Sequence, residues 1–296
     1  MDTAPQTAAP RTDVSREDGF RFDGRDRDPA GIAEQIRILD VNNSRPAVRA
    51  LKEWAFRRLA PRPGETALDV GAGTGEDVVA LAAGVGRHGR AVGVEPVAGL
   101  RTEAERRAAE RGVAVDMADG DVRSLAFPDG CFDIVRCERV LQHIEDPAQA
   151  VAEMTRVLAP GGRIALLDTD WSTAVLHPGP ADVVDRVLDA LSAPLANPQA
   201  GRQLRGLLVA AGVDVADCEA ATWIDDGAAG ARAPASELPW RALRCGAVTR
   251  EEAVRLSQEL ARASAAGAFF RATTVFGAFG TRVDGPPGKA KGPSIA

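Results

Sequence analysis

Three glycines at alternate positions, Gly71, Gly73 and Gly75, follow a short apolar run and have the spacing of a cofactor-binding turn. Glycine has no Cβ, so the chain can turn tightly there and a ligand can approach the main chain closely. Apolar residues after the turn predict a helix through 78–82, whose free N–H groups and positive dipole end would face the ligand. The pattern predicts a site for a carboxylate or phosphate group, with an ordinary glycine-rich turn as the alternative.

Carboxylates downstream of the turn suit the rest of a nucleotide-like ligand. Glu95 ends the next apolar segment, about 20 residues after the glycines, where an acid can grip both hydroxyls of a ribose. Asp121 could accept a hydrogen bond from the exocyclic amine of an adenine, and Asp119 is the alternative for that role. The acids and the glycines together favour a nucleotide-like cofactor.

These residues can meet only in a fold that brings the carboxyl ends of several strands to one edge, as open α/β sheets do. Apolar runs predict strands over residues 67–70, 91–94, 132–137, 163–167, 213–224 and 269–282. Helical spacing of apolar residues covers 31–60, 181–191 and 250–265. The alternation indicates an α/β fold with its ligand site at the carboxyl edge of the sheet.

Five segments carry a family resemblance in their order and spacing: ALDVGAGTG, VGVEP, GDVRSLAFPDGCFDIV, ERVLQHIEDP and EMTRVLAPGGRIAL. Over about residues 64–170 the chain resembles the class I S-adenosylmethionine-dependent methyltransferases, specifically the branch similar to ubiquinone and menaquinone biosynthesis methyltransferases. The resemblance implies a Rossmann-like α/β fold with a seven-stranded, mostly parallel sheet whose last strand is antiparallel. It also implies that the cofactor is S-adenosyl-L-methionine.

The resemblance implies a role for each part of the motif. The methionine moiety would lie on the glycine turn, the ribose on Glu95 and the adenine near Asp121, with Glu138 and Arg139 beside the sulfonium. Asp69 would face the ammonium group. The expected cofactor-binding residues are Asp69, Gly71, Ala72, Gly73, Thr74, Gly75, Glu95, Pro96, Asp121, Val122, Glu138 and Arg139.

A nicotinamide cofactor is the natural rival, because it uses a related turn. The dinucleotide fingerprint places its third glycine three positions after the second, and Glu76 occupies that position here. A carboxylate would repel a pyrophosphate, whereas S-adenosylmethionine carries no phosphate. The sequence therefore disfavours NAD.

His143 is the candidate general base. Methyl transfer from a sulfonium needs mainly an acceptor held close and collinear, but a hydroxyl or acidic carbon acceptor must also lose a proton. An imidazole with a pKa of about 6.5 can accept that proton at cellular pH. The alternative is that His143 bonds a backbone carbonyl within a local turn.

Residues leaving the strand over 163–167 are candidates for acceptor contacts, because they line the crevice of such a fold. The candidate substrate-binding residues are Asp170, Trp171 and Arg202, with Asp168 and His177 also considered. Arg202 could clamp an anionic substrate or begin a helix with its charge in water. In the break within 31–60, Arg45 and Asn42 could touch a ligand, whereas Asn43 and Ser44 suit capping.

Composition and charge argue against several classes of binding partner. The net charge is −6 and lysine occurs only at 52, 289 and 291, so there is no basic stripe for a nucleic acid. The four cysteines lack zinc-type spacing, so we expect no metal. No run approaches the about 18 apolar residues of a membrane span, and we expect a cytoplasmic protein with a small-molecule acceptor. A homodimer is compatible with the sequence.

The expected organisation is one methyltransferase domain over 31–283 between mobile tails at 1–30 and 284–296. Within it, 31–60 would form a helical lid, 64–170 the cofactor-binding core, and 171–283 an acceptor-pocket insert that also completes the sheet. We expect methyl transfer to an O, N or C atom in specialised-metabolite or quinone-like biosynthesis. The alternatives are a cyclase or pericyclic catalyst that keeps S-adenosylmethionine bound for its charge, and a noncatalytic partner subunit.

Overall fold

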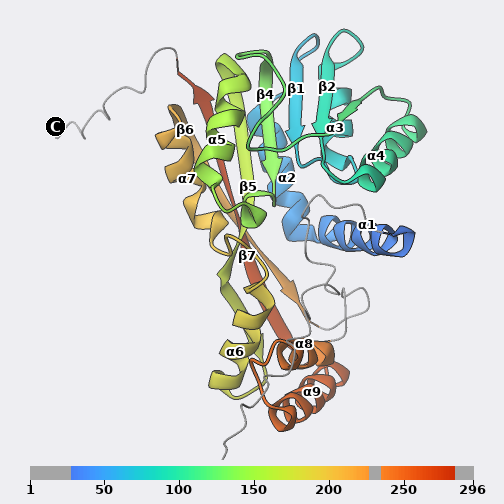
Figure 1. Cartoon of the computed structure of the whole chain (residues 1–296), viewed down its shortest axis with the longest axis vertical. Helices are drawn as coiled ribbons and strands as arrows, with labels where there is room; N and C mark the ends of the chain where they lie inside the picture. The colour runs from blue at the N-terminus through green and yellow to red at the C-terminus, as the bar shows by residue number, and fades with distance from the viewer. Residues whose placement is uncertain (1–27, 227–234, 284–296) are drawn as a thin grey trace, which may run out of the picture.

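The computed structural model describes residues 28–226 and 235–283. Its centre is one seven-stranded sheet with the order β3-β2-β1-β4-β5-β7-β6 (Figure 1). The strands are β1 (Thr66–Val70), β2 (Arg90–Val94), β3 (Asp116–Ala118), β4 (Phe132–Glu138), β5 (Leu158–His177), β6 (Val213–Asp225) and β7 (Phe270–Arg282). Strands β1 to β5 pair in parallel, and β7 runs antiparallel to both β5 and β6. The predicted seven-stranded, mostly parallel sheet with an antiparallel last strand is confirmed.

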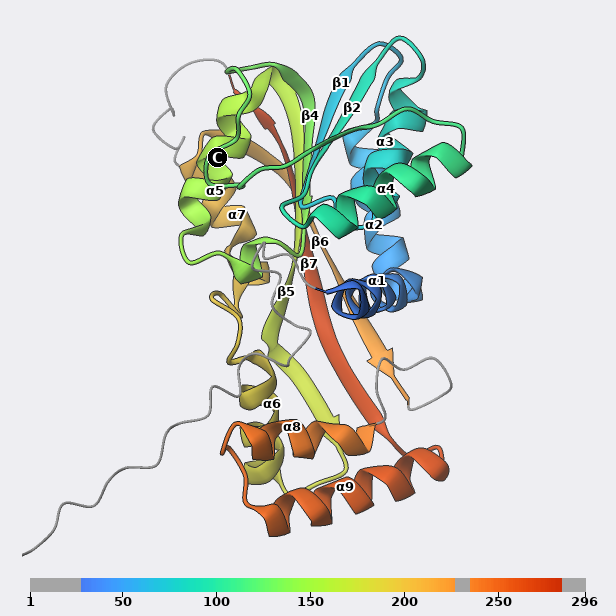
Figure 2. The ribbon, with the colours of Figure 1, turned by 45° about the vertical axis from the view of Figure 1, so that its right-hand side comes forward.

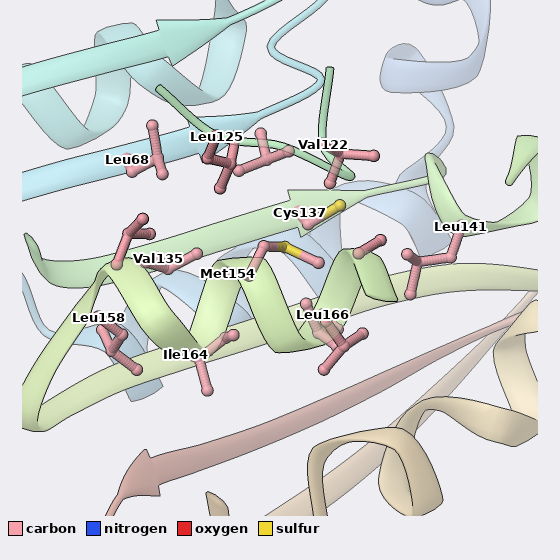
Figure 3. Packing of buried hydrophobic residues seen from close by; sticks show 14 of the residues in the cluster. Leu68, Val122, Leu125, Val135, Cys137, Leu141, Met154, Leu158, Ile164 and Leu166 are labelled. Atoms are coloured by element: carbon pink, nitrogen blue, oxygen red, sulfur yellow. The ribbon is translucent and has the colours of Figure 1, made fainter. Parts of the chain in front are cut away.

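Helices cover both faces of the sheet, as the apolar runs of its strands require. Helices α2 (Pro46–Leu59) and α3 (Glu76–Val85) pack on one face, and α4 (Ala98–Glu110) lies beside α3 (Figures 1 and 2). Helices α5 (Pro147–Val157) and α7 (Ala200–Ala210) pack on the other. Figure 3 shows Met154 of α5 among Cys137, Val135 and Leu166 of β4 and β5, in the part of the core beneath the site.

The predicted helical segment 31–60 is two helices, α1 (Pro29–Ser44) and α2, separated by Arg45. The backbone of Arg45 is extended, as expected before a proline, and Pro46 opens α2. Asp40 of α1 forms an ion pair with Arg107 of α4 at 2.8 Å, and Leu39 faces the glycine turn. Helix α1 therefore lies against the carboxyl edge of the sheet, where a lid was expected.

Strand β5 is longer than the sequence indicated. The expected strand ended at Leu167 and an insert followed from Trp171, but β5 continues to His177 and pairs there with β7, past an irregularity between Asp170 and Val175. The strand therefore ends later than expected, at His177, and the role of 171–283 as an acceptor-pocket insert stays a prediction. The extension exists because Leu176 packs into a separate apolar cluster beyond the main core.

That cluster joins three helices at the far end of the long strands (Figure 2). They are α6 (Ala181–Ser192), α8 (Leu238–Arg244) and α9 (Arg250–Ala265), and the one-turn helix η3 (Ala235–Glu237) packs beside them. A second one-turn helix, η2 (Leu141–His143), follows β4. A capping box in which Thr249 and Glu252 bond each other's backbone opens α9. The mobile tails predicted for 1–30 and 284–296 lie outside the described residues, apart from 28–30, where Asp28 caps α1.

Candidate active site

The glycine turn is a tight loop that the main chain of β2 holds in place. Gly71, Gly73 and Gly75 have φ values of 72°, 54° and 82°, in the region that favours glycine. The N–H groups of Gly71 and Ala72 both donate to the Val94 carbonyl, at 2.8 and 3.0 Å. These bonds connect the end of β1 to the end of β2, so the turn and Glu95 occupy one edge.

Protein packing also requires these glycines. A Cβ on Gly71 would collide with Val140, and one on Gly75 would lie 2.6 Å from the Cβ of Ala104. We expected a side chain in the turn to exclude a ligand, but at these two positions it would first meet the protein. At Gly73 a Cβ would lie 3.3 Å from Leu39 of α1.

Glu95 is positioned by two backbone donors. Its Oε2 accepts from the N–H of Gly73 and its Oε1 from the N–H of Val97, both at 3.0 Å. The side chain is buried, which raises its pKa, while the two amide bonds lower it. Arg101 donates to the Glu95 carbonyl at 2.6 Å and to Asp119 at 3.1 Å. A fixed, buried carboxylate with acceptor capacity left over suits a pair of hydroxyl groups.

A cavity of about 880 Å³ lies between the turn, α1 and the carboxyl edge of β4. Every predicted cofactor-binding residue except Asp69 and Gly75 lines it, and so does His143. Asp121 is among them, but its carboxylate forms an ion pair with Arg123 at 2.6 Å, which lowers its pKa. Contact of Asp121 with an adenine stays a prediction.

A buried ionic cluster forms the floor of the cavity beside the turn, and the sequence analysis missed it. Lys52 lies 2.7 Å from Asp77 and 3.5 Å from Glu138, and Arg136 lies 3.0 Å from Asp77 and also pairs with Glu138. Attraction to Lys52 and the arginines outweighs burial and lowers the pKa of Glu138. The sequence did contain a sign of this cluster, because Lys52 is the single lysine before residue 289.

Asp69 belongs to this cluster and does not line the cavity. Its Oδ1 accepts from Arg136 at 3.3 Å, and burial raises its pKa to about 7. The expected contact of Asp69 with an ammonium group stays a prediction. Asp77, unlike Asp69, lines the cavity.

His143 lies where the large cavity meets a smaller one of about 100 Å³. Its backbone N–H donates to the Val140 carbonyl at 2.9 Å, in the turn of η2. Burial, and secondly the charge of Arg139, lower its pKa to about 4. The imidazole is therefore neutral at physiological pH, as a base must be, although its lowered pKa makes it a weak one. The role of general base stays a prediction.

The smaller cavity adjoins the site on the acceptor side. It shares Asn42, Arg139, Gln142 and His143 with the large cavity, and Trp171 forms part of its wall. The indole N–H of Trp171 donates to Gln142 at 2.8 Å. Arg45 also lines this cavity. The structure thus brings Trp171, Arg45 and Asn42 to the site.

The remaining candidates do not reach either cavity. Asp170 forms an ion pair with Arg202 of α7, and neither residue lines a cavity. Asp168 is buried and accepts from the N–H of Gln142 at 3.2 Å, so it supports the chain beside the site. His177 pairs with Phe270 at the far end of β5. Asn43, by contrast, does line the large cavity; it does not cap α2, and its side-chain oxygen accepts from Arg139 at 2.6 Å.

Within residues 28–226 and 235–283, no group of His, Cys, Asp and Glu side chains could hold a metal ion. Among the helices of the same ranges, none combines the length and the apolar character that a bilayer crossing demands.

Comparison with known proteins places the central part of the chain. Residues 68–166 match the methyltransferase domain family. The 37.1 kDa protein in transposon TN4556 of Streptomyces fradiae is 37% identical over 199 residues, which are 66% of this chain and 56% of that protein. The demethylmenaquinone methyltransferase of Bacillus cereus (strain AH187) is 32% identical over 140 residues, 46% of this chain and 59% of that enzyme. The chain thus spans little more than half the length of these relatives.

Solved structures share the fold. A Bacillus halodurans protein provisionally described as a methyltransferase has a TM-score of 0.57 at 17% identity and covers 79% of this chain and 99% of its own. A SAM dependent methyltransferase from Aquifex aeolicus has a TM-score of 0.51 at 16% identity and covers 87% of this chain and all of its own. The motifs, the sheet order and the match of residues 68–166 agree, and this central part of the chain is a methyltransferase domain with the class I fold.

Proposed function

We propose that this chain is an enzyme that binds S-adenosyl-L-methionine in the 880 Å³ cavity and transfers its methyl group to an O, N or C atom of a small molecule. One observation carries the proposal. The same cavity unites the glycine turn, Glu95 and the Glu138–Arg139 edge, and it adjoins a second cavity through His143. A donor and an acceptor can therefore occupy neighbouring spaces.

The residues present fit this cofactor. The cavity volume lies within the range of about 300–1,000 Å³ that is usual for small-molecule sites. Glu95 offers a buried carboxylate to the ribose hydroxyls, whereas the N–H groups of Gly71, Ala72 and Gly73 already donate to Val94 and Glu95 and give the turn its shape. The acids Asp77 and Glu138 suit the cofactor's ammonium and sulfonium charges.

When bound, the cofactor supplies a methyl group on a positively charged sulfur with a neutral leaving group. The protein's main contribution is then to hold the acceptor close and in line, which can lower the barrier by about 7–11 kcal/mol. Leu39 and Asn42 of α1 shield the site from water. For a hydroxyl or acidic carbon acceptor, the neutral imidazole of His143 takes up the proton, whereas a neutral amine needs no such step.

The demethylmenaquinone methyltransferase relative supports a place in quinone-like or specialised-metabolite biosynthesis. We also propose a cytoplasmic location, in keeping with four free cysteines, since thiols stay reduced there.

Two measurements test the proposal. Isothermal titration calorimetry of the full chain should detect binding of S-adenosylmethionine and S-adenosylhomocysteine. A screen of candidate acceptors should then release S-adenosylhomocysteine together with a product heavier by one methylene. Absence of heat for both nucleosides would refute cofactor binding, whereas product formed without S-adenosylhomocysteine would indicate a cyclase that keeps the cofactor intact.

A further inference from the structure

The smaller cavity has an unusual concentration of positive charge for a buried space. Four of its lining residues are arginines and one is an acid: Arg45, Arg139, Arg241, Arg271 and Asp225. Arg139 already pairs with Glu138 at 2.8 Å. Arg241 is partnered as well, so the excess of positive charge falls on Arg45 and Arg271, which share the attraction of the single carboxylate Asp225. Burial of two guanidinium groups with one shared carboxylate is costly unless a ligand offsets it.

Arg45 and Arg271 come from opposite ends of the sequence and meet at one tryptophan. The guanidinium carbon of Arg45 lies 4.1 Å from the ring centroid of Trp223, and that of Arg271 lies 5.3 Å from it. Trp223 is on β6, Arg271 on β7 and Arg45 at the break between α1 and α2. Contact with the ring fixes the direction of both side chains without using their N–H donors in the plane of the guanidinium.

Both arginines keep a donor unused. The Nε atoms of Arg45 and Arg271 are buried and have no hydrogen-bond partner within the described ranges. An orphaned donor on a charged group costs free energy, so two of them beside one cavity indicate a missing acceptor. Burial lowers the pKa of Arg271 to about 10; attraction to Asp225 opposes this effect, and repulsion by Arg45 and Arg241 adds to it. Arg271 nevertheless stays charged at physiological pH.

The rest of the wall is apolar and aromatic, with Ile38, Val48, Leu195 and Val275 beside Trp171. We propose that this cavity binds an oxyanion of the methyl acceptor, a carboxylate or a phosphate, between Arg45 and Arg271. The acceptor is then an amphiphilic anion whose apolar part extends past His143 toward the methyl group. This inference rests on the proposed function and specifies its substrate class.

Binding of paired probes to the full chain tests the inference. The protein is first saturated with S-adenosylhomocysteine, and calorimetry then compares benzoate and phenyl phosphate with the neutral analogue benzamide. At least one anion should bind about tenfold or more tightly than benzamide, and the stronger of the two identifies the preferred oxyanion.

Variants separate the site from general charge effects. Arg45→Gln and Arg271→Gln should each weaken anion binding about tenfold or more, and Arg271→Lys, which keeps the charge, should weaken it less. The control Arg205→Gln removes an exposed arginine on α7 and should leave the affinity for the anion unchanged. Affinity for S-adenosylhomocysteine, which reports an intact fold, should stay within about twofold in all four.

The outcomes are distinct from those that test the proposed function. If S-adenosylhomocysteine fails to bind the unaltered chain, the proposed function is wrong. If it binds, but the anions bind no better than benzamide or the two glutamine variants bind them as well as the unaltered chain does, the oxyanion site is refuted. Should Arg271→Gln lose nucleoside binding, Arg45→Gln and Arg271→Lys decide the matter by the same criteria.

Discussion

Replacing Glu95 with glutamine tests the cofactor site most directly. The carboxylate accepts from two backbone N–H groups, of Gly73 and Val97, each at 3.0 Å. Glutamine has one oxygen, so its amide NH2 must face one of these donors. That donor loses its partner in a buried place, and the ribose loses a charged acceptor at the same time.

The change in Kd follows from the weakened hydrogen bond to the ribose, because the bond to the backbone donor is lost in the free and the bound protein alike. A hydrogen bond to a charged group contributes about 1.5–3 kcal/mol, and 1.4 kcal/mol corresponds to a tenfold change in affinity. We therefore expect the Kd for S-adenosylhomocysteine to rise about 10- to 150-fold in Glu95→Gln. Calorimetry measures the Kd, and urea unfolding shows whether the variant is folded under the same conditions.

A matched control is available on α4. Glu105 is an exposed glutamate that lines neither cavity, so Glu105→Gln should bind as the unaltered chain does. If a folded Glu95→Gln variant kept its affinity within about twofold, Glu95 would not hold the ribose, and the assignment of the large cavity would have to be withdrawn.

Three further results are expected. Gly75→Ala should lower the free energy of unfolding by about 2–4 kcal/mol in urea, because the new Cβ combines a positive φ with a contact of 2.6 Å to Ala104. The control is Gly206→Ala in α7, where the new Cβ would have no neighbour within 4 Å. This variant should raise the free energy of unfolding by up to about 1 kcal/mol, and equal changes in the two variants would contradict the packing argument. Lys52→Met should lower the free energy of unfolding in urea by about 3–5 kcal/mol, because Asp77 and Glu138 lose a counterion. An unchanged free energy of unfolding would show that Lys52 does not stabilise the cluster. His143 has a pKa of about 4 in the folded chain against about 6.5 in the unfolded chain, so the unfolded chain binds the extra proton as the pH falls. The free energy of unfolding should therefore decrease by up to about 3 kcal/mol between about pH 6.5 and 4. Urea unfolding across that range should show a smaller decrease in His143→Gln, and an equal decrease would contradict the lowered pKa.

The sequence predicted the cofactor side of the site well because its geometry is local. Each strand is followed at once by the residues that line the cavity, such as Gly71 after β1 and Glu95 after β2. In a parallel sheet the carboxyl ends of the strands share one edge, so the spacing alone places these residues together.

The acceptor side was harder to predict, because alternation along a strand decides which side chain faces the site. Asp170 and Trp171 are neighbours on β5, and successive side chains point to opposite faces of a sheet. Trp171 lines the smaller cavity, whereas Asp170 turns to Arg202 on α7. Nothing local in the sequence separates the two: regular pairing of β5 with β7 stops at Asp170, and the backbone N–H of Trp171 donates to the Pro198 carbonyl instead.

By itself the sequence determined the α/β class, the glycine turn and the acid that follows the second strand, since these depend on backbone conformation and short spacings. Only the tertiary structure decided that β5 and β7 extend beyond the core, and that Arg45, Trp223 and Arg271 meet beside His143. The physical reason is distance along the chain. Residues so far apart are joined by the long antiparallel pairing of β6 with β7, whose register leaves no local pattern in the sequence, although the two strands and the break before Pro46 do.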